Sequence, residues 1–269
     1  MRMDEALREG AIDLARRAAA DILAVYDSAA FEADADVRHK DDRSPLTAAD
    51  LASHRCIVDG LARLTPGIPV LSEESKSLDI AERRQWRRFW LVDPLDGTRE
   101  FLKRNGEFTV NIALVEDGVA VFGVIQQPVT GALWHGAPGS GAFRRTGAGD
   151  DVALRTRVPA AAPLRVAASR SHRDARTQAL LDALPAHETQ ACGSSLKFCR
   201  IAEGGIDLYP RFGPTSEWDT AAGQAILEAA GGAVLDPRGR PFRYNQRDSL
   251  LNGDFVALGD VALRAILPP

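Results

Sequence analysis

Two aspartates end an apolar run of the chain, in segment 93–98 with the sequence DPLDGT. Trp90, Leu91 and Val92 before them are typical of a buried strand. Proline fixes its own φ and glycine lets the backbone approach a ligand, so we expect a turn directly after this strand. Two carboxylates at such a turn suit hard divalent cations, which take oxygen ligands. An ordinary loop explains the same residues, because Asp-Pro and Asp-Gly are common in turns.

Acidic residues stand at the ends of several other expected elements, and the full set is Asp50, Glu73, Glu74, Asp93, Asp96 and Asp219. Each has an ordinary explanation when it is taken alone. An acid in the first turn of a helix complements the dipole, paired glutamates are typical of solvated loops, and an aspartate can cap a helix. Their distribution over both halves of the chain favours one metal site in a cleft.

Carboxylates that crowd together repel one another unless cations compensate their charge. Two or three Mg²⁺ ions would do so and would polarise a phosphate. Gly97 and Thr98 can donate backbone N–H and hydroxyl hydrogen bonds to that phosphate. The five histidines are scattered without metal-ligand spacing, and no Ser-His-acid arrangement is evident.

The elements that must position these acids follow from periodicity and turn signals. Helices are expected over residues 4–26 and after Pro45, the second with Thr47 or a neighbour as its cap. Strands are expected over residues 68–71, 86–92, 108–115, 119–125 and 132–136. This first half, residues 1–150, is expected to be mainly antiparallel and to carry most of the metal ligands.

A segment rich in Gly, Ala, Asp and Pro, residues 147–163, is typical of a crossover between two halves. The elements expected after it are strands over 164–168, 206–210 and 233–235 and helices over 173–184, 195–203 and 220–230. This mixture indicates an α/β layer behind the first half. Residues 151–269 are therefore expected to form a second part that completes the metal site.

The chain has 269 residues, of which 45% are hydrophobic and 26% charged, as in globular proteins. Its net charge of −4 gives no sign of the basic field that nucleic-acid binding needs. Three cysteines match no zinc motif, so we expect reduced thiols in a cytoplasm. We expect no targeting segment and no spanning helix, because no basic start with an apolar run and no run of about 18 apolar residues is visible. Peripheral attachment to the inner face of the cell membrane is the alternative to a purely cytoplasmic location. Oligomeric state is not determined by the sequence.

Three motifs in this order resemble the inositol monophosphatase superfamily of Mg²⁺-dependent, lithium-sensitive phosphatases: SEE at 72–74, DPLDGT at 93–98 and WDTAAG at 218–223. Further segments resemble its branch of bacterial bisphosphate nucleotidases: KDDRSPLT at 40–47, EFLKRNGEFTVN at 100–111, SSLKFC at 194–199 and LYPRFGP at 208–214. The resemblance runs from about residue 40 to 232. It implies an α/β (α+β) fold, the layered αβαβα sandwich of the sugar phosphatases.

The resemblance also implies a set of metal ligands. Glu73, Asp93 and the carbonyl of Leu95 would hold one Mg²⁺, and Asp93, Asp96 and Asp219 would hold a second. In the same way it implies the catalytic residues. Thr98 and Glu73 would position and activate the attacking water.

Asp50 would orient Thr98, and Glu74 would lie behind the ligands. Backbone N–H groups of Gly97 and Thr98 would hold the departing phosphate. The residues expected to touch substrate next to the metal ions are Leu95, Asp96, Gly97, Thr98 and Asp219.

A bisphosphate nucleotide keeps a second phosphate, which needs cations away from the metals. Lys197 and Arg211 are the candidates, with Ser194 and His172 donating hydrogen bonds, as the resemblance implies. Arginine suits bidentate phosphate contacts. Ordinary surface charge is the alternative explanation for both cations.

The preferred reaction is direct hydrolysis by water of adenosine 3',5'-bisphosphate (PAP) to AMP and phosphate, with its sulfated form (PAPS) giving APS as a second case. Lys103 and Arg104 either guide the anion or belong to a solvated turn. One alternative is an inositol or sugar monophosphatase with the same metals. Another is a catalytically silent nucleotide sensor, which the intact set of acids argues against.

Overall fold

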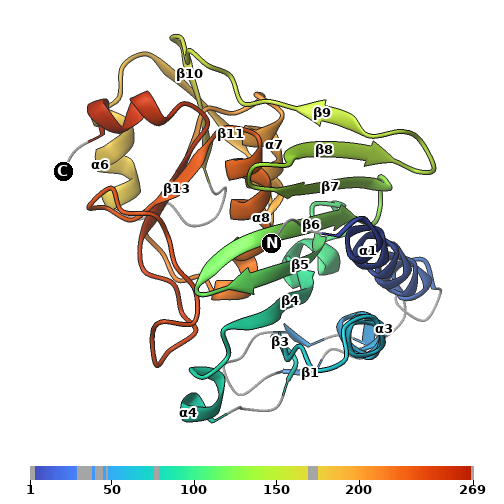
Figure 1. Cartoon of the computed structure of the whole chain (residues 1–269). Helices are drawn as coiled ribbons and strands as arrows, with labels where there is room; N and C mark the ends of the chain where they lie inside the picture. The colour runs from blue at the N-terminus through green and yellow to red at the C-terminus, as the bar shows by residue number, and fades with distance from the viewer. Residues whose placement is uncertain are drawn as a thin grey trace.

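Two sheets and the helices packed on them form the protein (Figure 1). The structure is a computed structural model that describes residues 4–28, 38–39, 45–46, 48–75, 79–168 and 175–267. His172, Thr47 and most of the 40–47 motif lie outside the described residues.

The larger sheet has seven strands in the order β3-β4-β5-β6-β7-β8-β9. Their bounds are β3 Val70–Ser72, β4 Arg88–Asp96, β5 Thr109–Glu116, β6 Val119–Gln127, β7 Ala132–Ala137, β8 Gly141–Thr146 and β9 Val152–Leu154. All neighbours pair antiparallel except β3 and β4, which are parallel. The expected antiparallel character is therefore confirmed. Strand β9 lies inside the segment expected to be a crossover, and β1 (Arg38–His39) pairs separately with β2 (Pro45–Leu46).

The smaller sheet has five strands in the order β11-β10-β12-β14-β13. Their bounds are β10 Leu164–Ala168, β11 His187–Ala191, β12 Leu208–Arg211, β13 Ala233–Leu235 and β14 Phe255–Leu258. Strand β10 is parallel to β11 and β12, whereas β14 is antiparallel to both of its neighbours. We did not expect β11 or β14. Strand β11 is polar and mostly exposed, and so lacks an apolar alternation.

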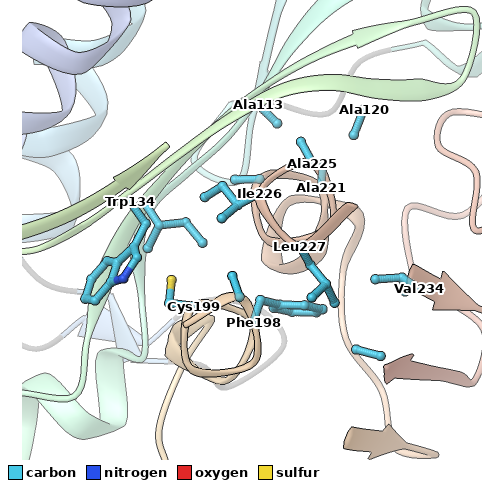
Figure 2. Packing of buried hydrophobic residues seen from close by; sticks show 14 of the residues in the cluster. Ala113, Ala120, Trp134, Phe198, Cys199, Ala221, Ala225, Ile226, Leu227 and Val234 are labelled. Atoms are coloured by element: carbon cyan, nitrogen blue, oxygen red, sulfur yellow. The ribbon is translucent and has the colours of Figure 1, made fainter. Parts of the chain in front are cut away.

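Helices form three layers around the two sheets, and their bounds are α1 Glu5–Tyr26, α3 Ala48–Leu64, α6 Ala175–Ala183, α7 Leu196–Ala202, α8 Glu217–Ala229 and η1 Val261–Ile266. One apolar cluster joins α1 and α3 to the large sheet, and another joins α6 and η1 to the small sheet. Between the sheets, Ala221 and Ile226 of α8 pack with Phe198 of α7, Trp134 and Val234 (Figure 2). The layered αβαβα sandwich is confirmed. None of the described helices is long and apolar enough to cross a membrane.

Candidate functional site

Three carboxylates from two distant parts of the chain meet at one end of the large sheet. Asp93 and Asp96 of β4 and Asp219 of α8 each offer an oxygen, and these oxygens lie within 4.8 Å of one another. Asp93 is 1% exposed. Oxygen ligands at this density suit a hard divalent cation.

Strand β4 reaches further than expected and carries both aspartates within it. We expected a strand that ends at Val92 and then turns, and this is wrong: β4 continues to Asp96. Its register against β5 shifts between Asp93 and Asp96, so the strand stays paired although Pro94 lacks an N–H. The turn comes at Gly97, whose φ of 91° suits glycine, and α5 (Thr98–Leu102) begins directly after it.

Short contacts hold the backbone of this segment. Oδ1 of Asp93 accepts the Leu95 N–H at 3.1 Å, and the Ser53 hydroxyl of α3 donates to the Pro94 carbonyl at 2.7 Å. Thr98 Oγ1 lies 3.4 Å from the Leu95 carbonyl, to which it donates.

Glu73 and Asp50 approach the cluster from neighbouring elements. Ser72 pairs with Val92 in the parallel β3–β4 ladder, and the Glu73 N–H donates to the Val92 carbonyl at 3.1 Å. Glu73 and Asp93 each come directly after this pair, so the two residues lie on neighbouring segments at the same level of the sheet. Asp50 lies in the first turn of α3 and is 1% exposed.

Burial and mutual repulsion perturb the acids of the cluster. Burial first, then Glu73, Asp96, Asp219 and Asp50, raise the pKa of Asp93 well above its usual range. Burial, then the charge of Asp96, raises the pKa of Asp219 to about 8. The three carboxylates repel one another when they are ionised, and a bound divalent cation would offset this repulsion. The residues present therefore fit a metal ion.

Burial also raises the pKa of Asp96, to about 6, but Lys197, the Ser195 N–H and Asn111 oppose this increase. The Ser195 N–H donates to Asp96 Oδ2 at 2.6 Å, and Asn111 Nδ2 donates to the same oxygen at 3.4 Å. We did not assign Ser195 or Asn111 a role from the sequence. A polar Asn111 between the apolar residues Val110 and Ile112 of the buried strand β5 was the available signal.

Helix α8 places Asp219 inside its first turn. We expected the helix to begin at Thr220, but it begins at Glu217, with Ser216 as its N-cap. Asp219 Oδ2 accepts the Ser216 N–H at 2.8 Å in a capping box. Asp219 is therefore not the N-cap of the helix, which is Ser216, but the N3 partner in its capping box. The same carboxylate also meets Asp93 and Asp96 in the cluster.

A pocket of about 330 Å³ opens beside the cluster and is lined by both halves of the chain. Asp96 and Asp219 form part of its wall, together with Ser194, Lys197 and Arg211. Lys197 is 7% exposed, and its Nζ donates to the Ser194 carbonyl at 3.0 Å. Arg211 donates to the Pro214 carbonyl at 2.9 Å.

Further cationic residues reach this pocket. Lys103 lines it, as does Arg99, which we did not single out from the sequence. Arg104 instead donates to the Tyr26 carbonyl at 2.7 Å and lies over the Tyr26 ring, so it fastens the end of α1. Tyr209 also lines the pocket, with Lys197 Nζ 5.3 Å from its ring centre.

The layered sandwich, with an acidic cluster formed by β4 and the first turn of α8, is the arrangement that the resemblance to the inositol monophosphatase superfamily implied. Residues 3–261 match the sequence profile described as the inositol monophosphatase family. The chain therefore belongs to the inositol monophosphatase family.

Named relatives cover most of this chain. The 3'(2'),5'-bisphosphate nucleotidase CysQ of Escherichia coli (strain K12) is 50% identical over 242 residues, which are 90% of this chain and 95% of the relative. The CysQ protein of Haemophilus influenzae is 35% identical over 83% of this chain and 84% of its own length. The crystal structure of CysQ from Bacteroides thetaiotaomicron, a bacterial member of the same family, has a TM-score of 0.79 at 43% identity, and covers 93% of this chain and 96% of that one.

Proposed function

We propose that the protein is a Mg²⁺-dependent 3'(2'),5'-bisphosphate nucleotidase that hydrolyses PAP to AMP and phosphate, with PAPS as a second substrate that gives APS. The observation that carries the proposal is one pocket whose wall holds Asp96 and Asp219 of the three-carboxylate cluster together with Lys197 and Arg211. Relatives named as such nucleotidases, up to 50% identical to this chain, support the same substrate class.

In this proposal the acidic cluster holds two or three Mg²⁺ ions. Glu73, Asp93 and the Leu95 carbonyl serve one ion, and Asp93, Asp96 and Asp219 serve a second. Bound Mg²⁺ would polarise the phosphate and lower the pKa of a coordinated water.

The chain's own residues then orient the attack. Thr98 and Glu73 hold the water, and Glu73 accepts its proton while Asp50 orients Thr98. The water oxygen bonds to phosphorus as the bond from phosphorus to the 3'-oxygen breaks, and that oxygen takes up a proton. N–H groups in the first turn of a helix lack intrahelical partners, so those of Gly97 and Thr98 suit the departing phosphate.

The second phosphate is proposed to bind on the side of the pocket formed by the C-terminal half. Lys197 and Arg211 supply charge there, Ser194 supplies a hydrogen bond, and His172, outside the described residues, is proposed as a further donor. The division at residue 150 thus separates most metal ligands from the nucleotide contacts. A cytoplasmic location is proposed because Cys56, Cys192 and Cys199, all within the described residues, form no disulfide.

Phosphate release from a substrate panel tests the proposal. We expect Mg²⁺-dependent turnover of PAP at a kcat/KM well above that for inositol 1-phosphate or glucose phosphates. A clear preference for inositol 1-phosphate would favour the monophosphatase alternative. Tight nucleotide binding without phosphate release under any divalent cation would favour the silent sensor.

A further inference from the structure

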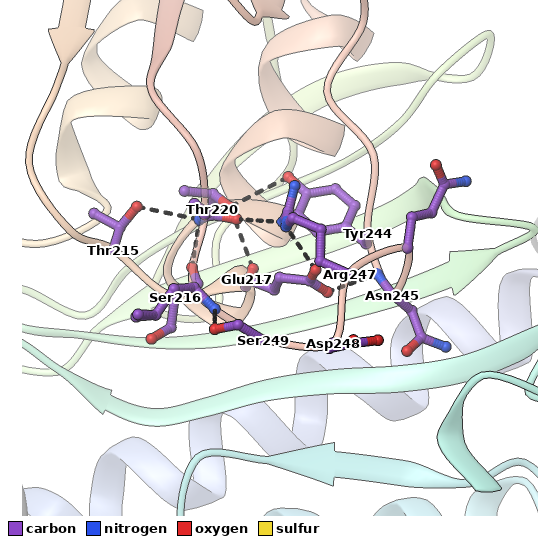
Figure 3. Close-up of polar contacts among 12 residues, drawn as sticks. Thr215, Ser216, Glu217, Thr220, Tyr244, Asn245, Arg247, Asp248 and Ser249 are labelled. Atoms are coloured by element: carbon purple, nitrogen blue, oxygen red, sulfur yellow. Dashed lines mark hydrogen bonds and ion pairs between the residues drawn. The ribbon is translucent and has the colours of Figure 1, made fainter. Parts of the chain in front are cut away.

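An ion pair with a buried carboxylate lies at the start of α8, two residues before Asp219. The Glu217 side chain is 0% exposed, and Arg247 Nη2 lies 2.9 Å from its Oε1. Its Oε2 accepts the Asn245 N–H at 2.7 Å. Figure 3 shows Glu217 and Arg247 among the polar contacts between the start of α8 and segment 244–249. Both oxygens of Glu217 therefore point into this loop.

The same loop holds the backbone at the start of α8. Asn252 Nδ2 donates to the Ser216 carbonyl at 2.6 Å, and its Oδ1 accepts from Arg247 at 3.2 Å. The Glu217 N–H donates to the Leu250 carbonyl at 2.8 Å. Loop and helix are thus joined through Ser216, Glu217, Asn252 and Arg247.

Ser216 connects this loop to the candidate metal ligand. Its N–H donates to Asp219 Oδ2 at 2.8 Å, while its carbonyl accepts from Asn252. A displacement of the Ser216 backbone would therefore carry the Asp219 carboxylate with it.

Arg83 extends the connection to the first half of the chain. It is 2% exposed at the end of α4 (Ile80–Arg83), and its guanidinium donates to Asn245 Oδ1 at 2.6 Å and to the Arg247 carbonyl at 2.7 Å. Helix α4 follows the Glu73 segment in the sequence. The loop therefore contacts both the element that carries Asp219 and the one that follows Glu73.

We propose that Glu217 and Arg247 act as a pair of positioning residues that fix the Asp219 carboxylate for metal binding. An ion pair that desolvates a carboxylate rarely stabilises a fold more than well-packed apolar residues would, so we assign the Glu217–Arg247 pair a role in fixing geometry. Neither residue lines the pocket among the described residues, and so neither is expected to touch substrate. The inference rests on the metal role given to Asp219 in the proposed function.

Arg247→Met tests this pairing, with Arg157→Met as the matched control. Arg157 pairs with Asp207, whose side chain is also 0% exposed, and the two arginines are 31% and 36% exposed. Both variants should lose thermal stability, because each removes the closest guanidinium from a buried carboxylate. In the control, Arg165 Nε remains 3.8 Å from Asp207. Only Arg247→Met should weaken Mg²⁺ binding, by about 10- to 100-fold, as is usual when the group behind a ligand is removed.

The measurements are the Mg²⁺ concentration for half-maximal activity, kcat at saturating Mg²⁺, and calorimetric Mg²⁺ binding to the full-length protein without substrate. Arg247→Lys should restore most of the Mg²⁺ affinity, and Glu217→Gln should lower it. If Arg247→Met destabilises like Arg157→Met but keeps its Mg²⁺ affinity within about twofold, the proposal is overturned. It is also overturned if the wild-type protein binds no Mg²⁺.

The calorimetric measurement separates the two proposals. If the wild-type protein binds Mg²⁺ but releases no phosphate from PAP, the proposed function fails while the positioning role is still decided by the shift in Mg²⁺ affinity.

Discussion

The backbone N–H of Ser195 donates a hydrogen bond to Asp96 Oδ2 at 2.6 Å, although 99 residues separate the two. The Ser195 hydroxyl donates to Asn111 Oδ1 at 2.7 Å, and Asn111 donates in turn to Asp96. These bonds close a ring that joins a carboxylate of the large sheet to the turn that carries Ser194 and precedes Lys197. Because of this ring, the acidic cluster and the cationic side of the pocket are fixed relative to each other.

Ser195→Ala should weaken this ring while the backbone N–H stays in place. The Ser195 hydroxyl also contacts Thr109 Oγ1 at 2.8 Å, so its removal leaves two buried polar groups short of a partner. We expect a loss of about 1–3 kcal/mol in the free energy of unfolding and weaker Mg²⁺ binding. Urea denaturation and Mg²⁺ titration measure both. Ser140→Ala, in an exposed turn, is the control, and equal behaviour of the two variants would contradict the role of the ring.

Asp93→Asn should abolish Mg²⁺-dependent turnover in a folded protein. Asparagine keeps the Oδ1 that accepts the Leu95 N–H but removes the charge needed for the cation. We expect a fall of roughly 10³-fold or more in phosphate release, because metal stabilisation contributes several kcal/mol.

The stability of Asp93→Asn supplies the second measurement. Burial and its acidic neighbours raise the pKa of Asp93, so the neutral variant should melt no lower than wild type when a chelator is present. Mg²⁺ should raise the Tm of the wild type and leave that of the variant unchanged. Retained activity would refute the assignment of the metal site.

Arg211→Met should act on the second phosphate of the substrate. Loss of a charge-assisted contact worth about 1.5–3 kcal/mol should raise KM for PAP by about 10- to 100-fold. The kcat for PAP should change little. The KM for a monophosphate substrate, which has no second phosphate, should change much less than the KM for PAP. Lys103→Met, at the same pocket, is the control and should affect mainly the salt dependence of kcat/KM. A loss of kcat alone in Arg211→Met would contradict a binding role.

Gly123→Ala should separate α8 from the large sheet. A Cβ at this position would lie 2.3 Å from the backbone oxygen of Ala222, which cannot rotate away. Such overpacking costs about 1–3 kcal/mol in unfolding free energy, and we expect Mg²⁺ affinity to fall as well because α8 carries Asp219. Gly253→Ala has no atom within 4 Å of the added carbon and serves as the control in a thermal melt. Wild-type stability in Gly123→Ala would contradict the close packing.

Acid should weaken the attachment of α1 to the large sheet. His135 is 1% exposed and contacts Asp151 at 3.0 Å, while Arg145 joins Asp151 to Glu9 of α1. Burial lowers the pKa of His135. Burial raises the pKa of Asp151, but hydrogen bonds to Arg145 and His135 outweigh this effect and lower the pKa to about 2.

Both depressed pKa values make the unfolded chain bind more protons than the folded one. The stability they contribute is therefore complete above about pH 6.5 and is lost as the pH falls, first through His135 and then through Asp151. The free energy of unfolding from urea titrations at pH 7, 6 and 5 should fall less for His135→Gln than for wild type. Equal slopes for the two proteins would show that His135 stays uncharged in both states or charges in both.

Several elements could be predicted from the sequence because their signals are local. The stripe of α1, the hairpin of β5 and β6, and the helix that contains Ala221 follow from spacing and turn residues. Strand β14 could not be predicted, because its place between β12 and β13 depends on partners far away in the sequence. The end of β4 was placed too early, since the sheet continues through Pro94 by a change of register.

The sequence by itself determined the donor types and their order: carboxylates at 73, 93, 96 and 219, and the cations Lys197 and Arg211. Only the tertiary structure decided how these groups are oriented. The Ser195 contact to Asp96 and the Glu217–Arg247 pair behind Asp219 join segments far apart along the chain. A hydrogen bond depends on distance and angle in space, which local patterns do not encode. The DPLDGT segment thus predicts a metal site, while the geometry of that site is set by contacts with other elements of the folded protein.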